Sequence, residues 1–207
     1  MTRGRFITFE GTEGVGKSTQ LETARQTLAS AGVRVLVTRE PGGTPMAESI
    51  RELLLSPREE PVNVLAELLL MFAARAQHLH ECILPALEQG TWVLCDRFTD
   101  ATYAYQGGGR GVPAGQIATL EQLVQGKVRP DHIILLDAPV EVGMARARSR
   151  GAPDRFEQEK TAFFQRIRDC YLARAEAQPL RYHVVDAAQP LDEVSRQVAG
   201  LIRTFLA

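Results

Sequence analysis

The octapeptide Gly11-Thr12-Glu13-Gly14-Val15-Gly16-Lys17-Ser18 combines residue types that together bind phosphate groups. It matches the pattern GxxxxGK[ST] and follows the apolar segment Phe6–Phe9 after a single residue, Glu10. In this pattern the glycines let backbone N–H groups turn toward phosphate oxygens, the lysine reaches the β- and γ-phosphates, and the serine hydroxyl binds Mg²⁺. The loop, with the next residue Thr19, predicts a nucleoside triphosphate site. It does not decide between a kinase, a motor ATPase and a GTPase switch.

A second polar pair, Asp96 and Arg97, follows the apolar segment Trp92–Cys95. The carboxyl ends of parallel strands meet at one edge of a sheet, so this pair is expected beside the phosphate loop. A carboxylate there can hold Mg²⁺ or its water, and a guanidinium group can fork onto a phosphate. Ser18 and Asp96 are therefore the predicted metal ligands. The alternative is that Asp96 and Arg97 form a local surface ion pair.

Two further stretches of the sequence limit the range of possible activities. They are Thr38-Arg39-Glu40-Pro41-Gly42-Gly43-Thr44 and Ala104-Tyr105-Gln106-Gly107-Gly108-Gly109-Arg110-Gly111. With the phosphate loop and Asp96-Arg97-Phe98, they resemble the thymidylate kinases among the nucleoside monophosphate kinases, and the similarity runs from about Arg5 to the C-terminus. The resemblance implies Mg²⁺-dependent transfer of the γ-phosphoryl group of ATP to dTMP, giving dTDP. Alternatives are a kinase for another nucleoside monophosphate or a deoxynucleoside and, from a different class, a nucleotide switch. The chain has no NKxD motif, which a regulatory GTPase would use to read its base.

The resemblance also assigns the dTMP site residue by residue. It implies that Arg97 binds the dTMP phosphate, that Phe72 stacks on thymine and that Arg75 hydrogen-bonds to the base. Phe72 and Arg75 are three residues apart, so they share one helix face, although a core phenylalanine beside a structural ion pair would fit the same spacing. The other implied dTMP ligands are Thr102, Tyr105 and Gln106 around the base and sugar, and Glu40, Pro41 and Arg51 toward the sugar and phosphate. In the family a cis peptide bond often precedes this proline.

Four arginines lie within ten residues, at positions 146, 148, 150 and 155. On a helix, positions 146 and 148 point about 200° apart, so the run is not one solvated face. The resemblance identifies residues 146–157 as a lid that closes over ATP. Position 13 is a glutamate, as in members that supply their catalytic arginine from the lid, so Arg150 is expected to supply this charge while Arg146 and Arg148 bind ATP. The expected catalytic residues are Lys17, Arg97, Arg150 and Glu13.

Apolar, β-branched segments alternate with segments of helical periodicity, which is typical of a parallel sheet. The expected strands are Phe6–Phe9, Val33–Thr38, Trp92–Cys95, Ile133–Leu136 and Tyr182–Val185. The expected helices are Lys17–Ala31, Pro45–Leu55, Val62–Gln89, Pro113–Gly126, Val140–Arg150, Gln158–Gln178 and Pro190–Leu206. The tract Gly107–Gly111 is expected to be irregular. The pattern predicts a single P-loop α/β domain over residues 1–207, with a five-stranded parallel sheet, helices on both faces in three layers, and a short lid.

Composition limits the partners. The 24 Lys and Arg against 25 Asp and Glu leave a net charge of -1, which argues against binding a nucleic acid polymer. Three cysteines without a CxxC pair, and an N-terminus without a signal peptide, favour the cytoplasm. The longest apolar stretch, Val62–Ala74, is shorter than the ~20 residues of a membrane span. The family resemblance implies a homodimer, and the apolar stretch Val64–Met71 offers surface for one.

Overall fold

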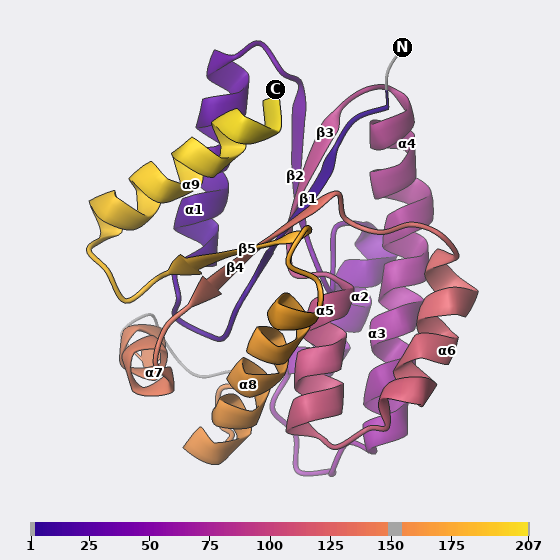
Figure 1. The fold of residues 1–207 in the computed structure, drawn as a ribbon. Coiled ribbons are helices and arrows are strands. Elements are labelled where there is room, and N and C mark those ends of the chain that lie inside the picture. Colours follow the sequence, from indigo (N-terminus) through magenta and orange to yellow (C-terminus); the bar gives the residue numbers. More distant parts are fainter. Residues whose placement is uncertain (1–2, 149–154, 207) are drawn as a thin grey trace.

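The computed structural model describes residues 3–148 and 155–206. Its strands form one parallel sheet in the order β2-β3-β1-β4-β5, which confirms the predicted sheet (Figure 1). The strands are β1 (Phe6–Glu10), β2 (Val35–Arg39), β3 (Trp92–Asp96), β4 (His132–Asp137) and β5 (Tyr182–Asp186). The strand order reverses at the central strand β1, so a crevice opens beyond its carboxyl end, where ligands bind in such sheets.

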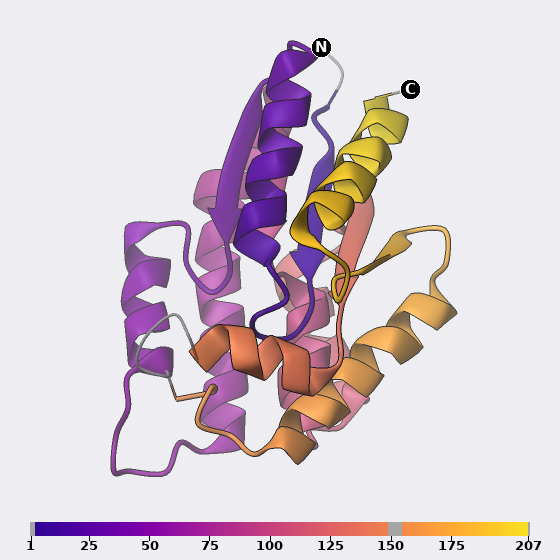
Figure 2. The same cartoon turned by 90° about the vertical axis from the view of Figure 1, so that its left-hand side faces the viewer.

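Helices cover both faces of the sheet. One face carries α1 (Lys17–Ser30) and α9 (Leu191–Leu206), which lie in front of the strands in Figure 2. The opposite face carries α3 (Val64–His78), α4 (Leu84–Glu88), α5 (Thr99–Thr102), α6 (Ala114–Gln125) and α8 (Thr161–Ala177). The two remaining helices are α2 (Pro45–Leu55), which packs on α3, and α7 (Val140–Arg148), which follows β4. This arrangement confirms the three-layer α/β fold.

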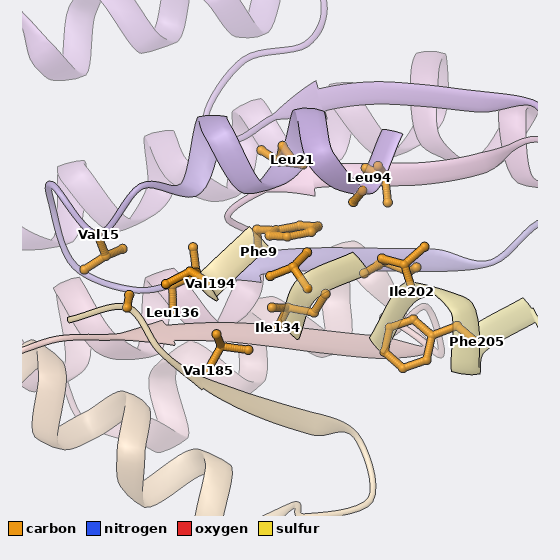
Figure 3. Packing of buried hydrophobic residues seen from close by; sticks show 14 of the residues in the cluster. Phe9, Val15, Leu21, Leu94, Ile134, Leu136, Val185, Val194, Ile202 and Phe205 are labelled. Atoms are coloured by element: carbon orange, nitrogen blue, oxygen red, sulfur yellow. The ribbon is translucent and has the colours of Figure 1, made fainter. Parts of the chain in front are cut away.

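The sheet faces differ because successive side chains of a strand point to opposite sides. Phe9 of β1 packs with Leu21 of α1 and Ile202 of α9 in the cluster shown in Figure 3. On the other face, Phe6 packs with Ile83 and with the ring of Phe98, 4.9 Å away between centroids. All five residues of β1 are buried, including the polar Thr8 and Glu10, so the strand does not alternate between apolar buried and polar exposed residues.

The expected long helix Val62–Gln89 is interrupted in the structure. A π-helical turn, η1 (Leu79–Ile83), separates α3 from α4, and the N–H of Leu84 donates to the carbonyl of Leu79, five residues earlier. Pro85 comes next and has no N–H to donate, so a wider turn at this point replaces the regular helical bonding. Helical periodicity over such a length does not reveal this local change.

The glycine tract is irregular only at Arg110 and Gly111, whereas Gly107–Gly109 are helical. Residues Tyr103–Gly109 form a π-helical segment, η2, which continues α5 and packs on α8. A Cβ at Gly108 would lie 2.9 Å from the carbonyl oxygen of Arg166, and one at Gly109 would lie 2.5 Å from the ring of Phe163. The glycines therefore allow close packing of η2 on α8, a role that composition alone does not distinguish from that of a flexible loop.

The predicted lid covers residues 146–157, and residues 149–154, with Arg150, lie outside the described part of the chain. Among the described helices, none is both long and apolar enough to cross a membrane.

Candidate functional site

A cavity of about 310 Å³ lies at the carboxyl ends of β1, β2 and β3. It is large enough for a small-molecule ligand. Of the predicted site residues, the structure brings fourteen to the cavity wall: Glu13, Gly14, Gly16, Lys17, Ser18, Glu40, Pro41, Arg51, Arg75, Asp96, Arg97, Thr102, Tyr105 and Gln106. The sequence interpretation did not include the lining residues Arg39, Leu55, Met71, Ala101, Phe156 and Glu157. Phosphate-binding and base-reading candidates thus share one cavity.

The phosphate loop connects β1 to α1. Gly14 has a φ of 72°, and a Cβ there would lie 1.9 Å from the carbonyl oxygen of Gly143 on α7, so only glycine fits. Lys17 Nζ donates to the carbonyls of Gly11, at 3.2 Å, and Thr12, at 2.9 Å. Burial and the nearby charge of Arg97 lower the pKa of Lys17. The lysine therefore spans the loop in a position where an anionic ligand would compensate its buried charge.

Four predicted ATP ligands in and just after the loop are not among the cavity-lining residues. Gly11 packs against the carbonyl of Leu136, Val15 enters the core, and Thr12 is buried. Thr19 is exposed on α1. Whether their backbone N–H groups contact a nucleotide stays a prediction.

Arg97 begins a sharp turn after β3. Its φ of 67° makes it the one non-glycine residue with a left-handed backbone in the ranges 3–148 and 155–206, a conformation that costs about 1–3 kcal/mol. The turn is held by the N–H of Arg97, which donates to the carbonyl of Phe9 at 2.9 Å, and by the N–H of Phe98, which donates to Glu10 Oε1 at 2.8 Å. The turn directs the guanidinium group back over the phosphate loop.

The guanidinium group of Arg97 pairs with the phosphate loop and not with Asp96, so the local ion pair considered from sequence is absent from the described contacts. Its NH2 donates to Glu13 Oε1 at 2.6 Å, and its NH1 donates to the carbonyl of Gly11 at 2.9 Å. The hydroxyl of Tyr105 also donates to Glu13 Oε1, at 2.9 Å, and its ring centroid lies 4.7 Å from the guanidinium carbon. Burial alone would lower the pKa of Arg97, but the charge of Glu13 raises it well above the ordinary value.

Beneath this network lies Glu10, which the sequence interpretation missed because it reads as the last residue of an apolar strand. Its Oε2 accepts the hydroxyl proton of Tyr171 at 2.8 Å. Burial, together with the charge of Asp100, raises the pKa of Glu10 to about 8. Because its Oε1 also accepts from Phe98, Glu10 supports the turn that carries Arg97.

Few side chains in the cavity could bind a metal ion. Asp96 lines the cavity near Ser18, and its buried Oδ1 has no hydrogen-bond partner among the described residues. A buried carboxylate oxygen without a partner is costly, so a cation or its water fits this place. Within the described ranges, no cluster of three or more His, Cys, Asp or Glu side chains could hold a metal by itself. A hydroxyl, one carboxylate and ligand phosphates are a set that suits Mg²⁺, which keeps several waters.

At the other end of the cavity, Arg75 is 2% exposed. Its Nε donates to Glu40 Oε2 at 2.7 Å, and its NH2 donates to Thr102 Oγ1 at 2.9 Å. Its buried NH1 has no partner in the described part of the chain. Because Arg75 lines the cavity, an acceptor on a ligand would satisfy this buried N–H group.

Phe72 is not among the cavity-lining residues. Its ring lies 4.8 Å from the guanidinium carbon of Arg75 and packs with Leu68 and Ile117. This position matches the core interpretation of Phe72 left open above, and its stacking on a base stays a prediction. Gln106 does line the cavity, and its Nε2 donates to Glu67 Oε1 at 2.9 Å.

His78, on α3, also contacts Glu40 at this end. Its ring nitrogens lie 3.1 Å from Glu40 Oε1 and 2.7 Å from Thr38 Oγ1. Burial would lower the pKa of His78, but hydrogen bonds to Cys82 and Glu40 outweigh it and raise the pKa to about 9. His78 and Arg75 thus both compensate the buried charge of Glu40, and each contacts a different oxygen of its carboxylate.

Glu40 and Pro41 are joined by a cis peptide bond, as the resemblance implied. Arg51 on α2 donates from NH1 to the carbonyl of Pro41 at 2.9 Å. Burial and the charge of Arg39 lower the pKa of Arg51. An anion in the cavity would relieve this crowding of positive charge.

Three of the four lid arginines are described. Arg146 donates to the carbonyl of Ala187 at 2.8 Å, and Arg148 is exposed at the end of α7. Neither is among the cavity-lining residues. Arg155 pairs with Glu67 at 2.6 Å, so this residue is engaged away from the phosphate loop. The assignment of the catalytic charge to Arg150 stays a prediction, since that residue lies outside the described ranges.

Comparisons with known proteins were consistent across the chain. The family model for thymidylate kinase matches residues 9–198. A thymidylate kinase from Pseudomonas entomophila is 61% identical over 203 residues, covering 98% of this chain and 97% of the relative. One from Teredinibacter turnerae is 56% identical over 203 residues, covering 98% of this chain and 99% of the relative. The crystal structure of thymidylate kinase from Ehrlichia chaffeensis is 35% identical with a TM-score of 0.77, covering 97% of this chain and 99% of that one.

Proposed function

The chain belongs to the thymidylate kinase family, and from this premise we propose that its cavity holds dTMP and the phosphates of ATP end to end. It is a nucleotide kinase that uses ATP and phosphorylates dTMP to dTDP. The observation that carries the proposed arrangement is the buried NH1 of Arg75, which has no partner among the described residues and belongs to a side chain that lines the same cavity as the phosphate loop. Such a donor suits a carbonyl oxygen of a nucleobase, and a second nucleotide pocket has no use in a simple triphosphate switch.

At the donor end, the phosphate loop binds the β- and γ-phosphates of ATP. Lys17 exchanges its bonds to the carbonyls of Gly11 and Thr12 for phosphate oxygens. Phosphoryl transfer involves little covalent chemistry on the protein, so positive charge held in place stabilises the transition state. Lys17 is the described residue best placed to do this.

Mg²⁺ is proposed to bind between Ser18, Asp96 and the phosphates of ATP. When bound, it neutralises the charge that develops on the phosphoryl oxygens. The unpartnered Oδ1 of Asp96 supports this assignment.

At the acceptor end, Arg97 and Arg51 bind the 5′-phosphate of dTMP. Arg97 approaches from the loop side, where Glu13 and Tyr105 fix its guanidinium plane. Arg51 approaches from α2, beside Pro41. Arg75, Thr102 and Gln106 face the base, while Glu40 and Tyr105 face the sugar. The transferred group thus passes between Lys17 and Arg97.

The further positive charge that stabilises the transferred phosphoryl group is assigned to the arginines of the lid, residues 146–157. Arg155 is paired with Glu67, and Arg146 binds the turn after β5, next to which the adenine of ATP is proposed to lie. These engagements support Arg150 as the arginine that reaches the transferred phosphoryl group, with Arg148 beside it.

The test is a coupled assay of ADP formation from ATP with dTMP, dUMP, dCMP, dGMP and AMP as acceptors. We expect dTMP to give the highest kcat/KM. A preference for a different monophosphate would favour the alternative kinase assignments. ATP hydrolysis that no acceptor stimulates would favour a nucleotide switch.

The chain is further proposed to form a homodimer through α2, α3 and α6. Leu65 and Leu69 on α3 are 54% and 48% exposed, and Leu123 on the adjacent α6 is 78% exposed. Burying such side chains on a second copy would remove apolar area from water.

Light scattering at micromolar concentration is expected to give twice the chain mass of 22.8 kDa. The double substitution Leu65→Asp with Leu69→Asp is expected to give the monomer, because it would bury two unpaired charges. Leu180→Asp, at a more exposed leucine between α8 and β5, should leave the mass unchanged. A wild-type monomer would disprove the proposal.

We place the protein in the cytoplasm. Its three cysteines, Cys82, Cys95 and Cys170, are all free thiols, which suits a reducing compartment. The net charge of -1 argues against a nucleic acid polymer as a partner.

A further inference from the structure

Glu67 on α3 is a buried carboxylate just behind the base-reading end of the cavity, with 1% of its surface exposed. Its Oε1 accepts a hydrogen bond from Gln106 Nε2 at 2.9 Å. Its Oε2 accepts one from Arg155 NH2 at 2.6 Å, and the Nε of Arg110 lies 3.5 Å from Oε1. The two guanidinium groups compensate the buried charge. Glu67 is not among the described residues that line the cavity, so it can act on a ligand only through Gln106.

The bond from Gln106 to Glu67 fixes the direction of an amide that has two distinct ends. A carboxylate only accepts hydrogen bonds, so it must face the NH2 group of Gln106. The carbonyl oxygen, Oε1, is then the end of the amide left for the cavity that Gln106 lines. With a neutral partner able to donate or accept, either end of the amide could face the cavity.

We propose that Glu67 is a positioning residue that fixes Gln106 with its carbonyl oxygen toward the nucleobase, and that it thereby selects bases that carry a proton on N3 over cytosine. This inference rests on the proposed function, because it requires Gln106 to meet the base of the acceptor nucleotide. Thymine and uracil carry a proton on N3, whereas N3 of cytosine carries a lone pair. A fixed carbonyl oxygen accepts from the first two and repels the third. When the two acceptors, the carbonyl oxygen of Gln106 and N3 of cytosine, face each other in a buried place, both remain without a hydrogen bond. Polar sites reject close analogues in this way.

The substitution Glu67→Gln removes this constraint with almost no change in shape. Arg155 can only donate, so the introduced amide is favoured with its oxygen toward Arg155 and its NH2 toward Gln106. Gln106 then accepts that bond with Oε1 and turns its own NH2 toward the base. The ratio of kcat/KM for dTMP to that for dCMP is expected to fall at least about tenfold, the size of one hydrogen-bond difference. The ratio of dTMP to dUMP is expected to stay within about twofold, because the two bases share the N3 proton.

Two controls separate this role from the loss of an ion pair. Arg155→Met removes the same ion pair but keeps the carboxylate, so the dTMP to dCMP ratio is expected to remain that of the wild type. The charge-balanced double variant Glu67→Gln with Arg110→Met keeps Arg155 to orient the introduced amide, since it removes the guanidinium that lies by the other oxygen. It is measured against Arg110→Met, and it keeps the test decisive if Glu67→Gln alone does not fold. In a Gln106→Met background, Glu67→Gln is expected to leave the ratio unchanged, because the two effects act through one group.

An unchanged dTMP to dCMP ratio in both Glu67→Gln variants would overturn the inference. So would equal losses for dTMP, dUMP and dCMP, which indicate a purely structural role for Glu67. These failures would leave the proposed function standing, since wild-type activity with dTMP is measured in the same assay. Absence of wild-type activity with dTMP would instead refute the proposed function, and the inference with it.

Discussion

Lys17→Met is expected to lower kcat by about 10²- to 10³-fold, the range found when one preorganised donor to a developing negative charge is removed. Lys17 Nζ is buried and held by the carbonyls of Gly11 and Thr12, so its charge lies in a place from which water is largely excluded. Electrostatic stabilisation is stronger there than in water. Methionine keeps the length of the side chain and its packing but carries no charge.

Steady-state assays with ATP and dTMP check this prediction. The KM for dTMP is expected to change little, since Lys17 is assigned to the donor phosphates. Lys127→Met, at an exposed lysine between α6 and β4, is the matched control and should keep wild-type rates. A kcat for Lys17→Met within a few-fold of the wild type would contradict the assigned role.

Arg150→Ala is expected to lower kcat by at least about a hundredfold while the affinity for dTMP stays similar. An arginine that reaches the transferred phosphoryl group contributes about 10³- to 10⁵-fold in related systems, and a second arginine of the lid can replace part of this contribution. The other lid arginines have different engagements: Arg146 binds the carbonyl of Ala187, and Arg155 binds Glu67. The loss should therefore be concentrated at Arg150.

The measurement is kcat for Arg150→Ala and Arg148→Ala, with dTMP affinity from titration calorimetry. Arg196→Ala, at an exposed arginine on α9, serves as the control for loss of one surface charge. If Arg148→Ala carried the large loss and Arg150→Ala stayed near the wild type, the assignment within the lid would be wrong.

Local patterns predicted most of the scaffold. The strands and the helix ends depend on nearby residues, which the sequence shows directly. Helix α2, for example, has Pro45 at its first position and is capped by the Thr44 side chain. The phosphate loop is equally local, because one octapeptide supplies its glycines, lysine and serine. The π-helical turns η1 and η2 were not predicted. Their cause lies in Pro85 for one and in packing against α8 for the other.

The partners of the site residues required the folded chain. Arg97 was expected near a phosphate, but its pairing with Glu13, 84 residues earlier, comes from the meeting of β1 and β3 in the sheet. Glu67 was part of an apolar stretch in the sequence. Its link to Gln106 spans 39 residues and exists because α3 packs beside η2.

The amino-acid sequence was thus sufficient for the fold class, the phosphate loop and the family, because each rests on short-range spacing that backbone geometry converts directly into structure. The sequence was not sufficient to predict which residues compensate each buried charge. Arg75 with Glu40 and His78, Arg97 with Glu13, and Glu67 with Arg155 and Gln106 are each brought together from distant segments. Burial makes these charges costly when unpaired, so tertiary contacts determine which of their N–H and oxygen atoms remain available to a ligand.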